Sequence, residues 1–261
     1  MHGSISEPTL IHLPGLHGDW TLLSPFRHAL NIRARFVEAT YPHQPDWSLD
    51  NYAASIESAL LERDITSGWI LGESFSSQVA WSFLHRQQQA GASARFHVKG
   101  LILVGGFMRH PWSWGVCLAQ AVSRRVPLTL LQFLCQLYIR GAKRRFHHCP
   151  GAAVEFDEFV VRRTNGPDRD VITRRYGLIA GNQPAAIARE TKLPVFHLTG
   201  AWDPIVPWWH VRPWLRKNCP GYRGTRVIWS GGHNVLLSSP QQSAEQILFW
   251  VKEARGVKRE T

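Results

Sequence analysis

The stretch Gly72-Glu73-Ser74-Phe75-Ser76 decides how this sequence is interpreted. It follows an apolar run at residues 69–71 and precedes a helix-like run at residues 78–85. A strand, a tight turn of small residues and a helix are the setting of a nucleophile elbow, which holds a serine in a strained backbone conformation with its hydroxyl exposed. The usual pattern is G-x-S-x-G, and Ser76 stands in place of the last glycine. Because serine is small, we expect only a slight spreading of the turn.

An acid and a base follow later strand-like segments. The run 194–199 leads into Asp203, and the run 225–229 leads through two glycines into His233. A serine hydroxyl holds its proton tightly at neutral pH, so a neighbouring imidazole must accept that proton, and a carboxylate must fix the imidazole tautomer. The order Ser74, Asp203, His233 therefore predicts a nucleophile, an acid and a base.

A short strand at residues 9–13 is followed by a glycine-bearing loop at residues 14–20. This loop resembles the one that many α/β-hydrolases place after a strand. With the elbow, acid and base in the same order, the chain resembles a serine hydrolase of the α/β-hydrolase superfamily from about residue 9 to about residue 254. The resemblance implies that the backbone N–H groups of Leu16 and Phe75 form an oxyanion hole.

Strand-like and helix-like runs alternate along the chain, which favours a parallel sheet covered on both faces. The strand-like runs lie near residues 9–13, 35–39, 68–72, 99–105, 194–199 and 225–230. We therefore predict an α/β protein with the α/β-hydrolase fold and about six mostly parallel strands. The first strand begins at residue 9, which leaves no room for an N-terminal antiparallel hairpin.

The gap between the strands near residues 105 and 194 is too long for one crossover. We expect residues 108–190 to form an inserted helical cap, and residues 1–107 and 191–261 to form the core. The helix-like cap segments are 112–124, 128–140, 153–163 and 168–190, the last broken near Gly181 and Pro184. Substrate-binding candidates are His17 in the oxyanion loop and, in the cap, Met108, Trp112 and Trp114, with Phe133 and Leu137 as further pocket or cap-core candidates.

The net charge of +11 is unevenly distributed. Residues 108–190 contain 13 Lys and Arg against 6 Asp and Glu, a balance of +7, while the remainder contains 17 against 13, a balance of +4. The apolar run 127–139 is followed by a basic cluster at residues 140–145. Such a segment is either a helix that contacts an anionic membrane surface weakly or a buried cap helix with an exposed basic turn, and we favour the second. We expect no nucleic acid partner.

Other classes of protein have little support in the sequence. No apolar run approaches the roughly 20 residues of a membrane span, and the N-terminus lacks a signal-peptide pattern. The four cysteines show no paired spacing and are interpreted as buried reduced thiols of a cytoplasmic protein. We expect no cofactor and no metal, since the run 147–149 is too compact for a zinc site. The acidic residues 155, 157 and 158 either bind a substrate ammonium or, as we favour, form a solvated helix face.

These observations predict a carboxylic ester hydrolase that acts on a small-molecule ester through an acyl-enzyme. A serine nucleophile argues against the branches of this fold that use aspartate, the haloalkane dehalogenases and epoxide hydrolases. Thioesterase, lactonase, C–C hydrolase and amidase chemistry use the same three residues and stay open as alternatives. A second class of hypothesis is a non-catalytic binding protein that uses its basic cap.

Overall fold

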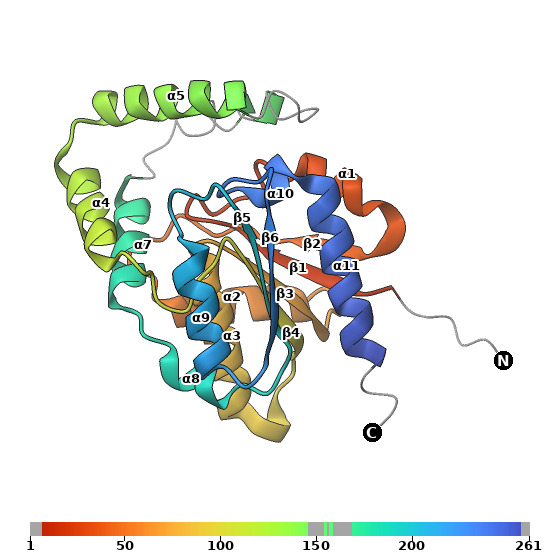
Figure 1. Ribbon diagram of the computed structural model, residues 1–261. Helices are drawn as coiled ribbons and strands as arrows, with labels where there is room; N and C mark the ends of the chain where they lie inside the picture. Colours follow the sequence, from red (N-terminus) through yellow and green to blue (C-terminus); the bar gives the residue numbers. More distant parts are fainter. Residues whose placement is uncertain (1–6, 146–153, 156, 159–168, 257–261) are drawn as a thin grey trace.

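In a computed structural model of the chain, six parallel strands form a single sheet with helices on both faces (Figure 1). The structure describes residues 7–145, 154–155, 157–158 and 169–256. The strands are β1 (Thr9–Leu13), β2 (Arg35–Glu38), β3 (Ser67–Glu73), β4 (His97–Val104), β5 (Val195–Gly200) and β6 (Tyr222–Ile228). The predicted α/β class and the six strand positions are confirmed, although β6 begins three residues earlier than expected.

Helices lie between successive strands, as the crossovers of a parallel sheet require, and two more follow the last strand. They are α1 (Ser24–Leu30), α2 (Leu49–Leu61), α3 (Ser76–Ala90), α4 (Ser113–Arg125), α5 (Leu128–Arg145), α7 (Arg169–Gly181), α8 (Ala185–Glu190), α9 (Trp208–Asn218), α10 (Val235–Ser238) and α11 (Pro240–Gly256). Two short 3₁₀ turns, η1 (Asn31–Arg33) and η2 (Gly91–Ser93), follow α1 and α3.

The strand order is β2-β1-β3-β4-β5-β6, and every neighbouring pair is parallel. Successive side chains of a strand point to opposite faces, so each strand contributes to two cores. Ile70 of β3 packs in the core beneath α2, α3 and α9, whereas Leu71 packs in the core beneath α1 and α11. Because all strands are parallel, their carboxyl ends lie at one edge of the sheet, and the loops that follow them meet there.

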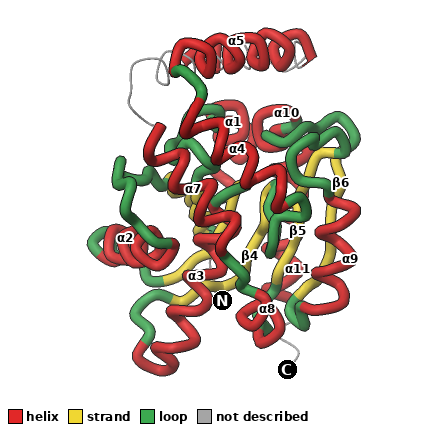
Figure 2. The backbone as a smooth tube through the Cα atoms, turned by 90° about the vertical axis from the view of Figure 1, so that its left-hand side faces the viewer, coloured by secondary structure: helices red, strands yellow, loops and turns green. Residues whose placement is uncertain are grey.

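The described residues between β4 and β5 are mostly helical, as expected, and α4 packs against α7. Figure 2 shows these two helices side by side, with α5 above them. The expected break near Gly181 and Pro184 separates α7 from α8, and α8 packs against α3 and α9. The predicted helix at 153–163 falls largely outside the described residues. The division into a core and a cap at residues 108–190 stays a prediction.

Two expectations about this segment are wrong. The described apolar side chains of α5 do not form a buried cap helix, since Leu130, Phe133 and Leu137 are all exposed. The helix lies along the top of the molecule in Figure 1. Cys117 on α4 is exposed as well, whereas Cys219 is buried as expected.

Candidate active site

Ser74 occupies the sharp turn between β3 and α3. Its φ of +50° lies in the left-handed region, which costs a non-glycine residue conformational energy and is typical of functional turns. Its backbone N–H donates to the Val104 carbonyl at 2.9 Å, which ties the turn to the neighbouring strand. A Cβ atom at Gly72 would lie 2.8 Å from the Ser76 carbonyl oxygen, so only glycine lets the strand and helix approach this closely.

The loops after β3, β5 and β6 bring Ser74, Asp203 and His233 together. His233 Nε2 lies 2.9 Å from Ser74 Oγ, and His233 Nδ1 lies 2.8 Å from Asp203 Oδ2. These are hydrogen-bond distances, so the three side chains form one continuous chain of hydrogen bonds. Residues that are 159 positions apart in the sequence, Ser74 and His233, are thus in direct contact.

Asp203 is held as a buried carboxylate. Its Oδ1 accepts the backbone N–H groups of Ile205 at 2.8 Å and Val206 at 2.9 Å, while Oδ2 faces His233. Burial lowers the pKa of His233, but the charge of Asp203 and its hydrogen bond outweigh burial, so the pKa of His233 is raised overall. His233 therefore holds a proton more strongly in this site than a free histidine side chain does in water.

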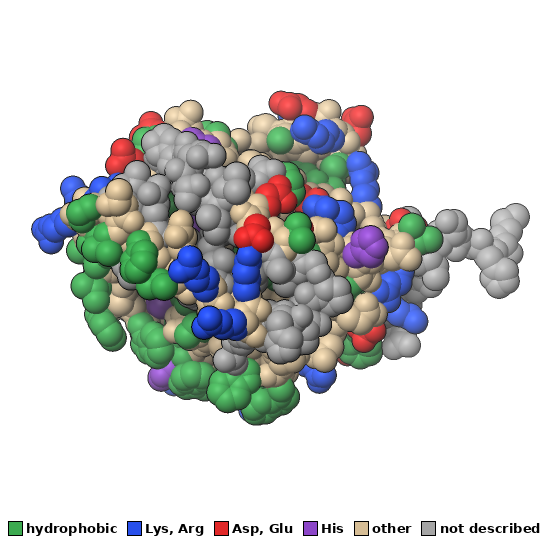
Figure 3. Space-filling view, turned by 90° about the horizontal axis from the view of Figure 1, so that it is seen from above, with side chains coloured by type: hydrophobic (Ala, Val, Ile, Leu, Met, Phe, Trp, Pro, Cys, Tyr) green, Lys and Arg blue, Asp and Glu red, His purple; other side chains and the backbone are tan. Residues whose placement is uncertain are grey.

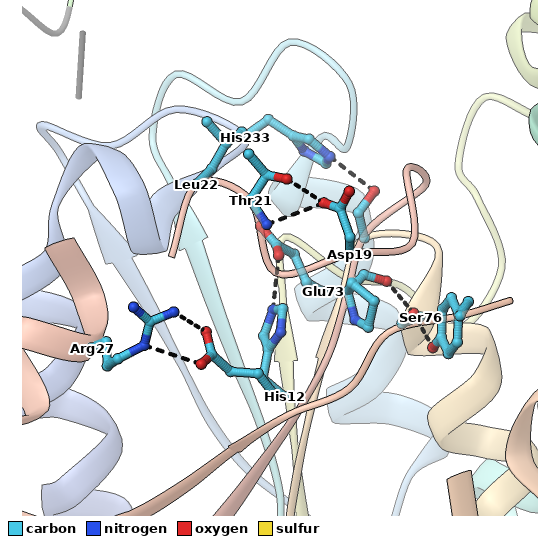
Figure 4. Close-up of polar contacts among 12 residues, drawn as sticks. His12, Asp19, Thr21, Leu22, Arg27, Glu73, Ser76 and His233 are labelled. Carbon is cyan, nitrogen blue, oxygen red and sulfur yellow. Dashed lines mark hydrogen bonds and ion pairs between the residues drawn. The ribbon is translucent and has the colours of Figure 1, made fainter. Parts of the chain in front are cut away.

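Ser76 links the elbow to the loop after β1. Its side chain is fully buried, and its hydroxyl donates to the Pro14 carbonyl oxygen while the Tyr41 hydroxyl donates to it at 2.5 Å (Figure 4). The same loop passes beside the nucleophile, because a Cβ atom built at Gly15 would lie 3.8 Å from Ser74 Cβ. The serine that replaces the glycine of the usual pattern is therefore part of the packing between these two segments.

The two residues expected to supply oxyanion-hole N–H groups lie on these segments. Leu16 lines the cavity beside Ser74, and Phe75 is the residue that precedes the first turn of α3, with its ring buried. The N-terminal end of a helix carries a partial positive charge, which suits a developing negative oxygen. Their role as an oxyanion hole stays a proposal.

Arg175, on α7, reaches into this region and is only 2% exposed. Its Nη1 donates to the Leu16 carbonyl oxygen at 2.7 Å, and its Nε donates to the Tyr52 hydroxyl at 3.2 Å. The guanidinium carbon lies 5.7 Å from the Phe75 ring centroid, within cation–π range. No pattern in the sequence marks Arg175, because one arginine among many carries no sign that it is buried.

Gly18 provides the space that Arg175 occupies. A Cβ atom at Gly18 would lie 2.5 Å from Arg175 Nη1, and the φ of Gly18 is +85°, a conformation that favours glycine. The loop after β1 is therefore shaped around a guanidinium from α7.

A cavity of about 470 Å³ opens beside Ser74 and His233. Its walls come from the loop after β1, from α4 and from α7, and they include His17 and Trp112, as expected. Trp114 does not line it, because its side chain points outward and is 71% exposed. Met108 does not line it either: Met108 is buried, lines a separate cavity, and accepts a hydrogen bond from Gln78 through its carbonyl.

His110 is a cavity residue that the sequence analysis did not single out. Burial lowers its pKa to about 4, and its Nδ1 accepts the backbone N–H of Trp112 at 3.2 Å. This imidazole is therefore neutral near pH 7. Its position six residues after β4 was the signal that could have marked it, since residues that follow parallel strands meet at the site.

The acidic residues near the site have structural partners. Glu73 pairs with His12 at 2.9 Å, and Asp19 accepts the backbone N–H of Thr21 at 3.1 Å (Figure 4). Glu155 is buried and accepts the Leu22 N–H at 2.8 Å, so the expectation of a solvated face is wrong for this residue. Asp157 is exposed and pairs with Lys143. Within the described residues, no three His, Cys, Asp or Glu side chains gather closely enough to hold a metal ion.

This combination of strand order, elbow and strand-end residues is the α/β-hydrolase fold, and the predicted fold is confirmed by solved structures of similar shape. A thermophilic esterase from Thermogutta terrifontis is 18% identical with a TM-score of 0.72, covering 95% of this chain and 90% of that one. An esterase from Exiguobacterium antarcticum is 15% identical with a TM-score of 0.72, covering 95% and 92%.

An enol-lactonase from Burkholderia xenovorans LB400 is 14% identical with a TM-score of 0.71, covering 96% of this chain and 93% of that one. Neither protein-family models nor curated protein sequences give a match. Because the structural relatives share so few identical residues, their likeness to this chain is a likeness of fold.

Proposed function

We propose that this protein is a serine hydrolase that cleaves carboxylic esters with Ser74 as nucleophile, His233 as base and Asp203 as acid. The observation that carries the proposal is the continuous chain of hydrogen bonds, 2.8 Å from Asp203 to His233 and 2.9 Å from His233 to Ser74. The chain ends at a cavity wall, where a substrate carbonyl has access to the serine hydroxyl.

In the first half-reaction, the Ser74 proton moves to His233 Nε2 while Oγ forms a bond to the ester carbonyl carbon. The carbonyl π electrons move to the oxygen, whose negative charge the Leu16 and Phe75 N–H groups stabilise. When the tetrahedral intermediate collapses, the C–O bond to the alcohol breaks and His233 gives its proton to the leaving oxygen. The product is an alcohol and an acyl-enzyme.

Water completes the cycle. His233 accepts one proton from it as the water oxygen bonds to the acyl carbon, and the same imidazole then returns that proton to Ser74 Oγ as the acid leaves. The two oxygens of Asp203 accept hydrogen bonds from His233 and from two backbone N–H groups. Its part is to hold the imidazole tautomer and stabilise the charged form.

The ester class is supported by the similar structures, which are described as esterases from two organisms. Two further similar structures are described as an enol-lactonase and an N-acyl homoserine lactonase. A lactone is a cyclic ester and follows the same steps, so lactone hydrolysis is the second candidate activity. Profiling chromogenic esters of increasing acyl length against a set of lactones separates the two.

Labelling with a fluorophosphonate tests the nucleophile. We expect an adduct mass on the Ser74 peptide of the folded protein, and none in Ser74→Ala, whose kcat should fall about 10⁶-fold. Ser82→Ala, on the same helix as the elbow but away from the cavity, is the matched control and should label normally. Folded protein that stays unlabelled and hydrolyses no ester or lactone would instead support a non-catalytic binding protein.

A further inference from the structure

The two cap helices nearest the top of the molecule expose apolar side chains in a regular pattern. On α4 these are Trp114, Leu118 and Val122, and on α5 they are Leu130, Phe133 and Leu137. Spacings of three and four residues place each trio along one side of its helix. We call these six residues the cap stripe; each is between 36% and 71% exposed.

The sequence that carries the cap stripe is basic, although Lys143 on α5 pairs with Asp157. Residues 109–154 include seven Lys and Arg and no Asp or Glu. Among them, Arg124 and Arg125 at the end of α4 and Arg140 on α5 are exposed. Figure 3 looks down on this face and shows hydrophobic side chains along one side of it, with Lys and Arg side chains beside them and Asp and Glu side chains near its middle. An apolar stripe flanked by cations is the pattern of a helix that lies in a membrane interface.

The cap stripe also adjoins the active-site cavity. Trp112, directly before α4, lines the cavity and is 38% exposed, so it connects the cavity wall to the surface. Ile205, across the cavity in the loop after β5, is exposed as well. A surface that covered the cap stripe would therefore lie next to the cavity opening.

We propose that the cap stripe and its cations dock on an anionic lipid surface. A second copy of the chain fits this face less well, because two such faces would bring like charges together. No described helix is both long and apolar enough to span a bilayer, so the contact is with the surface. The inference goes beyond the proposed function and does not depend on it, since Ser74→Ala should bind the same vesicles.

Flotation of the full chain with vesicles tests the proposal. We expect the protein to float with vesicles that contain about one third phosphatidylserine, to stay behind with pure phosphatidylcholine, and to dissociate as salt rises. The double variant Arg124→Gln/Arg125→Gln should bind about 25-fold more weakly, since each cation near an anionic surface strengthens binding about fivefold. The control Arg216→Gln/Lys217→Gln removes the same charge from exposed positions on α9 and should bind within about twofold of wild type.

A second pair of variants tests the contribution of the apolar side chains of the cap stripe. Phe133→Ser should weaken vesicle binding at least tenfold, whereas Phe249→Ser, an equally exposed phenylalanine on α11, should not. Equal loss in both variants, or no flotation at low salt, would overturn the proposal. Sedimentation velocity over a range of protein concentrations tests whether a second copy of the chain binds this face instead. A dimer that dissociates in Phe133→Ser would show that it does, and would overturn the proposal.

Discussion

Ser76 illustrates how much one side chain decides in this protein. The elbow pattern has glycine at this position, and the expectation from sequence was only a slightly wider turn. In the structure the hydroxyl is buried and bonds the Pro14 carbonyl oxygen and the Tyr41 hydroxyl, so the residue joins the elbow to the loop that carries Leu16.

Restoring the usual glycine should therefore impair the proposed activity. In Ser76→Gly the buried Pro14 carbonyl loses its donor, which should lower the free energy of unfolding by about 1–3 kcal/mol. A displaced Leu16 N–H should also lower kcat about tenfold. Tyr41→Phe, which keeps the bond to Pro14, is the comparison and should reduce kcat less. Urea unfolding and ester kinetics measure both; an unchanged kcat in Ser76→Gly would contradict this role.

The pair of Asp203 and His233 sets the pH dependence. The proposed mechanism needs neutral His233, whose pKa is raised because the Asp203 charge outweighs burial, so kcat/KM should fall as pH drops through that raised pKa. Asp203→Asn removes the charge, so the acid limb should move to lower pH while kcat falls about 10⁴-fold. A pH–rate profile checks this. An acid limb that stays in place would show that another group controls it.

At the scale of elements, α7 is coupled to the core through Arg175. The guanidinium from this helix donates to the Leu16 carbonyl oxygen, and its carbon lies 5.7 Å from the Phe75 ring. Both residues proposed to stabilise the oxyanion are thus in contact with one side chain of α7. The helix therefore does more than cover the cavity, because it holds the loop after β1 in place.

Arg175→Met tests this coupling. Without the guanidinium, the Leu16 carbonyl loses its donor and the adjoining Leu16 N–H is less firmly placed, so kcat should fall about 10²-fold while KM changes little. Arg175→Lys keeps the charge but not the planar guanidinium, so its kcat should lie between those of the wild type and Arg175→Met. The neighbouring exposed Arg174→Met is the control and should keep its kcat. Equal effects of the two methionine variants, or a change in KM alone, would argue that Arg175 only packs.

At the scale of the whole molecule, buried histidines make stability sensitive to acid. Burial lowers the pKa of both His197 and His110 from 6.5 to about 4. An unfolded chain therefore binds these protons before the folded one does. Their contribution to stability is complete above pH 6.5 and is lost as pH falls toward 4.

Acidification should accordingly lower the free energy of unfolding by about 3 kcal/mol for each of these residues. His233 acts in the opposite direction, because its raised pKa favours the folded state at low pH. Urea unfolding at pH 7 and pH 4.5 measures this loss in the free energy of unfolding. In His197→Gln the difference between the two pH values should be smaller. A variant with the wild-type pH dependence would exclude His197 as a cause.

The sequence alone determined the sheet, the chain order of Ser74, Asp203 and His233, and the place of each after a strand. Apolar runs mark parallel strands, and the carboxyl ends of such strands must meet at one edge of the sheet, so these residues had to lie close together.

Only the tertiary structure decided which other side chains join them. Trp112 ends the loop before α4 and lines the cavity, whereas Trp114 lies in the first turn of α4 and is 71% exposed. Arg175 contacts Leu16 across 159 positions of sequence, because α7 packs over the loop after β1. Such contacts depend on how the helices, strands and loops pack against one another, and no local pattern of residues encodes them.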